Sequence, residues 1–145
     1  MSFHYAITFL RDLNKNNSKA WMDGHRDEYE QTKDFLFGWI EAINRELARI
    51  DDDYSAIAPK KALSRINNNL LYHPNAPTYK DHFGISLVKA KDKGGFYLHL
   101  GLNGSFLGGG YHHPRSKTLS KIRDAIDNNG EQLKAIITQA SFVDL

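Results

Sequence analysis

The sequence predicts an α+β fold, with N-terminal helices, one of them long, a central antiparallel meander of three to four strands, and C-terminal helices. Three observations predict it. Apolar residues recur at helical spacing over the first 50 residues, apolar and other residues alternate from residue 96 to residue 102, and helical spacing returns after residue 114. Helices and strands that cluster in separate parts of a chain are typical of α+β proteins. We expect a single domain spanning residues 1–145.

The composition excludes several classes of protein. The chain has 145 residues, of which 41% are hydrophobic and 25% charged, and this suits one domain with its own core. The absence of Cys excludes disulfides and thiol nucleophiles, and fits a cytoplasmic protein. No signal peptide and no membrane-spanning run of about 18 apolar residues is visible, so no membrane partner is expected. The net charge is +2, and Lys and Arg are scattered along the chain. A nucleic-acid-binding protein usually has a denser basic stripe, so nucleic-acid binding is only a weak alternative.

Two helices are expected at the N-terminus. Ser2 can cap a helix over residues 3–13, and Asn17 or Ser18 can cap a longer second helix. Asp51, Asp52 and Asp53 oppose the dipole at a helix C-terminus, so the long helix should end before them. Its apolar stripe consists of Trp21, Tyr29, Leu36, Ile40, Ile43, Leu47 and Ile50.

The middle of the chain predicts the sheet. From Phe96 to Leu102 apolar residues alternate with Tyr97 and His99, which indicates a half-buried strand. Asn103-Gly104 is a strong signal for a two-residue hairpin turn. Residues 67–80 are rich in Asn and Pro and are expected to form a loop. The expected strands are residues 62–66, 85–90, 96–102 and 105–111, with a turn at 91–95.

Two helices are expected at the C-terminus. Pro114 or Ser116 can open the first, and Asn128, Asn129 and Gly130 should stop it. The second should cover residues 131–139.

Three segments, taken in order, resemble a family of conserved bacterial and fungal proteins of unknown function. They are Phe9–Leu13 with Asn16, Asn17, Trp21 and Tyr29; Arg65-Ile66 to Tyr79-Lys80; and Gly101, Gly104-Ser105, Gly108–Tyr111 and Pro114 before a helix with Ile122-Arg123. The resemblance covers nearly the whole chain. Because the family has no settled function, it implies no activity.

The chain departs from the family pattern in its middle segment and in its length. Arg65, Tyr79 and Lys80 keep the pattern, and Met22 replaces a Phe in the first segment. The family's Arg-Asp, Arg-Phe-Ser and Asp-Lys are replaced by Asn68-Asn69, Leu71-Tyr72-His73 and Asn75-Ala76. The resemblance therefore implies that most of a charged family site is lost here. It also implies a C-terminal part that this chain lacks.

The glycine run is the first candidate ligand-binding segment. Gly108, Gly109 and Gly110 allow close approach of a ligand to the main chain, and Tyr111 and Arg115 follow before an expected helix start. One hypothesis is that this segment binds a phosphate or carboxylate. The alternative is a bulge or bend beneath packed aromatics.

Arg65, Tyr79 and Lys80 are the second candidate. Arg offers a planar fork to an oxyanion and Lys a point charge. The alternative is that both cations pair with nearby acids while Asn side chains hold the loop. Together with the glycine run, these residues predict a binding domain for an anionic or polyhydroxylated ligand, provided that both groups meet at one hollow. The expected partner is thus a small molecule or a protein.

The histidines leave an enzyme as the other alternative. His99, His112 or His113 could act as a base, with Tyr79 and Lys80 as polar partners, in a hydrolase-like reaction. The His spacing matches no zinc motif, and His112 and His113 would point to opposite faces of a strand, so no metal is expected. No cofactor motif is visible either. The sequence assigns no oligomeric state.

Overall fold

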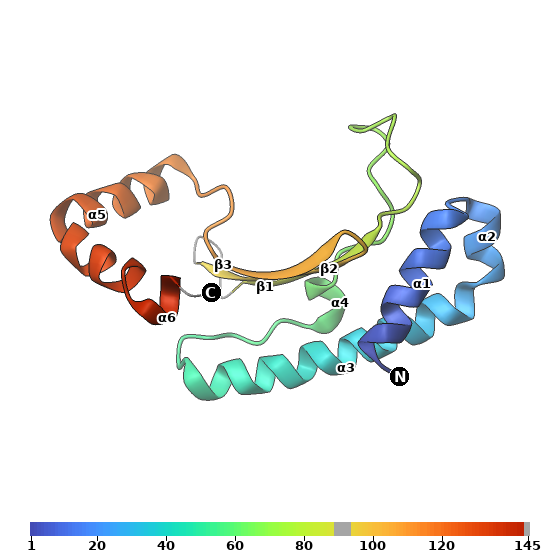
Figure 1. The fold of residues 1–145 in the computed structure, drawn as a ribbon, viewed down its shortest axis with the longest axis horizontal. Coiled ribbons are helices and arrows are strands. Elements are labelled where there is room, and N and C mark those ends of the chain that lie inside the picture. Colours follow the sequence, from blue (N-terminus) through green and yellow to red (C-terminus); the bar gives the residue numbers. More distant parts are fainter. Residues whose placement is uncertain (89–93, 144–145) are drawn as a thin grey trace. The chain divides into compact units, whose positions relative to one another are not determined.

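Helices occupy the beginning of the chain and pack on one side of a small sheet (Figure 1). The structure is a computed structural model, and it describes residues 1–88 and 94–143. It divides into two compact units, Met1–Gly110 and Tyr111–Leu145. The expectation of a single domain stays a prediction. No helix within the described ranges is long and apolar enough to cross a membrane.

Four helices belong to the first unit: α1 (Phe3–Lys15), α2 (Lys19–Gly24), α3 (Arg26–Ile50) and α4 (Pro59–Ala62). The expected long second helix is interrupted, because His25 leaves helical geometry and its ring Nδ1 lies 2.8 Å from the Trp21 carbonyl oxygen. Ser18 caps α2 by accepting a hydrogen bond from the Trp21 N–H at 3.3 Å. As expected, α3 ends before the three aspartates. Ile50, expected in the apolar stripe, is 80% exposed.

The sheet has three antiparallel strands in the order β1 (His82–Val88), β2 (Gly95–Gly101) and β3 (Gly104–Gly110). The expected strand at residues 62–66 does not form, since α4 ends at Ala62 and Leu63 makes only an isolated bridge to Ile85. β1 begins three residues earlier than predicted. The end of the predicted strand, at residues 89 and 90, and most of the turn at 91–95 lie outside the described residues.

The hairpin between β2 and β3 turns one residue earlier than predicted. Gly101 pairs with Gly104, so Leu102 and Asn103 are the two loop residues. Gly104 takes a positive φ of 123°, which favours glycine, and the Ser105 hydroxyl accepts a hydrogen bond from the Gly101 N–H at 3.3 Å. The register therefore places His99 opposite Phe106.

The core lies between the helices and one face of the sheet. Phe83, Ile85 and Leu87 alternate along β1 and are buried in one cluster with Leu10 of α1 and with α3. Figure 1 shows α3 and α4 on this side of the sheet. The other face carries His82, Gly84 and Ser86 from β1, with their register partners, and we call it the open face because no helix of the first unit covers it (Figure 1).

The second unit contains α5 (Ser116–Ile137) and α6 (Ala140–Val143). α5 starts at one of the two predicted positions. Its backbone leaves helical geometry at Asn129, with φ −132° and ψ 32°, where the sequence predicts a stop. α6 was not predicted.

Candidate functional site

Arg65 and Lys80 lie side by side where the loop before β1 begins and ends. The Ile66 carbonyl accepts a hydrogen bond from the Lys80 N–H at 2.8 Å, and Asn67 bridges Tyr79. The Lys80 ammonium donates to the Arg65 carbonyl oxygen at 2.7 Å. We call Arg65 and Lys80 the cation pair.

The cation pair has no carboxylate partner in the described part of the chain. The five ion pairs found there involve other residues. The nearest acid in sequence, Asp81, is held by the His82 ring and by Asn103, each at 3.0 Å. The predicted alternative, in which acids neutralise these cations, is therefore not observed. Its other half is observed, because Asn68 holds the loop by donating to the Pro77 carbonyl at 2.8 Å.

Burial and charge both destabilise the ammonium of Lys80. Partial burial lowers the pKa of Lys80 below its ordinary value, and the charge of Arg65 lowers this pKa further. A bound anion would oppose both effects, because an opposite charge favours the protonated amine.

Tyr79 is fixed between these cations and the helices. It is only 5% exposed. The Asn17 side chain receives the Tyr79 N–H at 2.9 Å and donates to the Tyr79 carbonyl at 3.0 Å, as a neighbouring strand would. These two hydrogen bonds fix the main chain next to Lys80. The Tyr79 side chain belongs to the core.

The glycine run lies at the other end of the sheet. Gly108, Gly109 and Gly110 belong to β3 and pair with Tyr97, Phe96 and Gly95. The cation pair precedes His82, which pairs with Gly101 at the hairpin end. The structure therefore does not bring the two predicted groups to one hollow. Tyr111 and Arg115 belong to the second unit.

Rings cluster on the open face. His82 stacks on His99 with ring centroids 4.2 Å apart, and His99 stacks on Phe106 at 5.0 Å. We call these three residues the ring stack. Burial lowers the pKa of His99 and the neighbouring His82 lowers it further, while Asp81 raises it. The net effect favours an uncharged His99 at neutral pH.

The enzyme hypothesis also includes His112 and His113. His112 and His113 are in the second unit and do not point apart as on a strand, because their rings meet edge to face at 4.3 Å. His113 has a φ of 48°, outside strand geometry. Histidine acid–base chemistry stays a prediction. Within residues 1–88 and 94–143, no group of three or more His, Cys, Asp or Glu residues could hold a metal ion.

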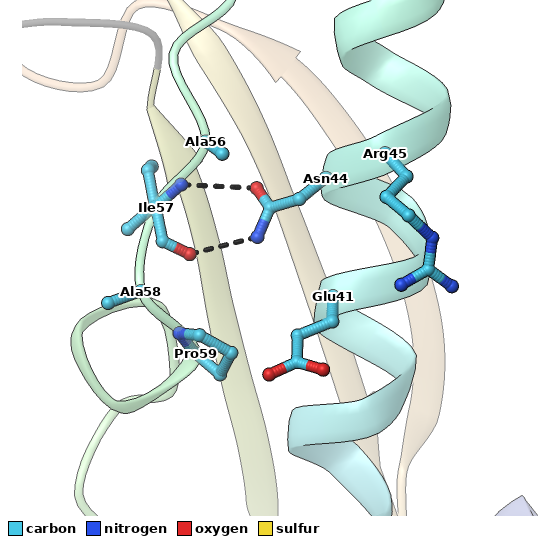
Figure 2. Close-up of a pocket in the computed structure, with 7 residues that line it drawn as sticks. All are labelled: Glu41, Asn44, Arg45, Ala56, Ile57, Ala58 and Pro59. Atoms are coloured by element: carbon cyan, nitrogen blue, oxygen red, sulfur yellow. Dashed lines mark hydrogen bonds between the residues drawn. The ribbon is translucent and has the colours of Figure 1, made fainter.

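A shallow hollow of about 310 Å³ lies between α3 and the segment before α4. Figure 2 shows Asn44 at its wall, bonded through both side-chain atoms to the Ile57 main chain. Asn44 Oδ1 also accepts from the Tyr54 hydroxyl at 2.6 Å. The polar side-chain atoms of Asn44 are thus already hydrogen-bonded. The other polar side chains that line the hollow are those of Glu41 and Arg45 (Figure 2). None of the predicted site residues lines this hollow.

A family model described as "Conserved hypothetical protein (DUF2461)" matches residues 5–145. The chain belongs to the DUF2461 family. No curated protein and no solved structure matches it.

Residues of the three segments that resemble the DUF2461 family contact one another in the structure. Asn17, from the first segment, binds the main chain of Tyr79, from the second. Gly101, from the third, leaves room for the ring of His99, because a Cβ at that position would lie 2.6 Å from His99 Nε2. These residues of the DUF2461 protein build the framework on which the cation pair and the ring stack lie.

Sequence reasoning considered His82 only as one of several histidines and Asn103 only as a turn residue, and it assigned Asp81 and Phe106 to no site. Asp81 and Asn103 meet across the beginning of β1 and the hairpin loop, 22 residues apart in sequence. The alternation of Phe83, Ile85 and Leu87 could have placed His82 on the open face. Phe106 needed the correct hairpin register, since a turn centred on Asn103-Gly104 would put Gly108 opposite His99.

Proposed function

We propose that this protein binds an anionic ligand, such as one carrying a phosphate or carboxylate group, through the cation pair. The observation that carries the proposal is that two adjacent positive side chains, one of them partly buried, have no carboxylate partner among the described residues. Placing like charges together costs free energy unless an anion or solvent compensates them.

The chemistry of the two side chains suits this role. Arg presents a planar fork that matches two oxygens of a phosphate or carboxylate, and Lys adds a point charge. The Asn17 bonds to Tyr79 fix the main chain beside Lys80 and so limit the ordering that binding would require. A separate anion contact at Gly108, Gly109, Gly110, Tyr111 and Arg115 stays a prediction.

A thermal-shift titration with inorganic phosphate tests the proposal. We expect phosphate to raise the melting temperature of the wild type in a saturable way, since a ligand that binds only the folded state stabilises it. Replacing both cations, R65Q with K80Q, should abolish this rise. The control is K121Q, which removes one exposed positive charge from α5. An equal rise in the double variant would contradict the proposal.

A further inference from the structure

The outer edge of β3 is a strand edge that no other described strand covers. β3 is the last strand of the sheet. The opposite edge is covered in part, because Ser64 donates its N–H to the Gly84 carbonyl of β1 at 2.8 Å. Among the described residues, no backbone hydrogen bond joins residues 105–109 to any element other than β2. Such an edge presents main-chain donors and acceptors that can pair with another strand.

The outward main-chain groups of β3 follow from the hairpin register. In a two-residue hairpin, the pair that flanks the loop exchanges hydrogen bonds, and here this pair is Gly101 and Gly104. The direction of the bonds then alternates along the strand, so even-numbered residues bond to β2. The odd-numbered residues direct their N–H and C=O groups away from the sheet: Ser105, Leu107 and Gly109.

β3 lacks the features with which proteins usually protect an edge strand. Charged side chains, proline and bulges serve this purpose. β3 contains neither charge nor proline, and its register with β2 is continuous from Gly104 to Gly110. It instead exposes Phe106 by 56% and Leu107 by 70%, on opposite faces of the strand. His99 stacks on the side of the Phe106 ring that looks toward β2, so the exposed side looks toward the edge.

The strand is complementary to a second copy of itself. Leu107 is its midpoint, so an antiparallel pair with a twofold axis at Leu107 aligns the outward groups of both copies along the entire strand. Each Phe106 then lies opposite Gly108 of the second copy. An aromatic ring opposite a glycine covers the gap left by the missing side chain. Phe96 does this within the chain, where its ring lies 3.4 Å from the Cβ position of Gly109.

We infer that β3 is the interface of a homodimer, in which two copies of β3 pair antiparallel about Leu107 and join the two sheets into one. Because the strand carries no charge, like charges do not meet across the axis. An extended peptide of another sequence would find the same main-chain groups but not the match of Phe106 with Gly108. The inference is independent of the proposed function, since the cation pair follows Ser64 at the other edge of the sheet.

Sedimentation velocity of the 145-residue chain, from about 1 µM to about 1 mM protein, tests the dimer. We expect a reversible monomer–dimer equilibrium in this range. L107K should weaken the dimer about tenfold, because two like charges would face each other across the axis and an apolar contact would be lost. A wild type that stays monomeric throughout would overturn the inference.

The matched control is L71K, which makes the same change at a leucine that is 84% exposed in the loop before β1. It should keep the wild-type equilibrium. Circular dichroism should show that both variants fold as the wild type does. If L107K dimerises as tightly as L71K, the interface is not β3.

Amide hydrogen exchange of the wild type, followed by NMR at low and high protein concentration, tests the register without variants. The N–H groups of Leu107 and Gly109 should exchange more slowly at high concentration, because only the dimer bonds them. Those of Phe106 and Gly108 bond to β2 in each copy and should depend much less on concentration. Exchange at Leu107 and Gly109 that does not slow, or that slows only as much as at Phe106 and Gly108, would overturn the inference.

Discussion

Single asparagine side chains hold distant parts of the first unit together. Asn17 and Asn44 both use their amide group as a peptide-like edge, Asn17 on Tyr79 and Asn44 on Ile57. The buried Asn44 also receives the Tyr54 hydroxyl. An Asn used in this way cannot be distinguished by sequence from an Asn that forms a turn, because both uses depend on the same amide group.

We expect Asn44→Ala to lower the free energy of unfolding by about 3 kcal/mol, since it removes three hydrogen bonds and leaves buried polar groups unpaired. Urea denaturation followed by circular dichroism measures this. The control is Asn16→Ala, which removes one exposed bond to the Asp12 carbonyl and should cost about 1 kcal/mol or less. Equal effects of the two substitutions would show that Asn44 does not fasten the loop.

The pKa of His99 predicts a pH dependence of stability. Burial and His82 depress this pKa in the folded state, despite the opposing effect of Asp81. The unfolded state then binds the proton more readily, so the contribution of His99 is complete above its ordinary value near 6.5 and is lost as the pH falls through that value toward the folded pKa.

Urea midpoints measured between pH 8 and pH 5 test this dependence. The wild type should lose stability as the pH falls below about 6.5, and His99→Gln should lose less over the same interval. A variant that follows the wild-type curve would show that His99 does not cause the loss.

Strands and helices were predicted more reliably than their ends. The alternation from Phe96 to Leu102 identified β2, and helical spacing identified α1, most of α3 and α5. The break at His25 and the earlier hairpin turn at Leu102-Asn103 were missed. Both are local features of backbone geometry, and the spacing of apolar residues does not report them.

The candidate site was predicted in part for the same reason. Arg65 and Lys80 meet because residues 66–68 pair with residues 78–80, and the loop between them concealed this pairing. The glycine run and the cation pair were expected to share a hollow, yet the strand register places them at opposite ends of the sheet. This separation can be predicted only from the correct strand register. The Asn103-Gly104 signal placed the hairpin turn one residue too late.

At the level of the sheet, Gly101→Ala should disturb the open face. The new methyl group would lie 2.6 Å from His99 Nε2 and 3.1 Å from His82 Cβ. Because the His99 ring can move partly aside, we expect the free energy of unfolding to fall by about 1 kcal/mol. The NMR chemical shifts of the His82 and His99 imidazoles should also change, since the two rings would no longer stack.

Gly108→Ala is the matched control, since a Cβ there meets nothing within 4 Å. It should leave stability and the imidazole signals nearly unchanged. If the two alanine substitutions behave alike, the proposed role of Gly101 is wrong.

Across the whole molecule, the described buried residues all belong to the first unit. We therefore expect a fragment of residues 1–110 to unfold cooperatively, at a urea midpoint close to that of the full chain. Circular dichroism and tryptophan fluorescence should report one coincident transition, because Trp21 and Trp39 both pack against this core. A fragment without a cooperative transition would contradict the assignment of a self-contained core.

The most direct measurement is the pKa of the Lys80 ammonium, determined by NMR of labelled lysine side chains with and without inorganic phosphate. Without phosphate, this pKa should lie below its ordinary value of 10.5, because of burial and the charge of Arg65. Phosphate should raise it, and the rise should disappear in R65Q. A Lys80 pKa that phosphate leaves unchanged would contradict an anion site at the cation pair.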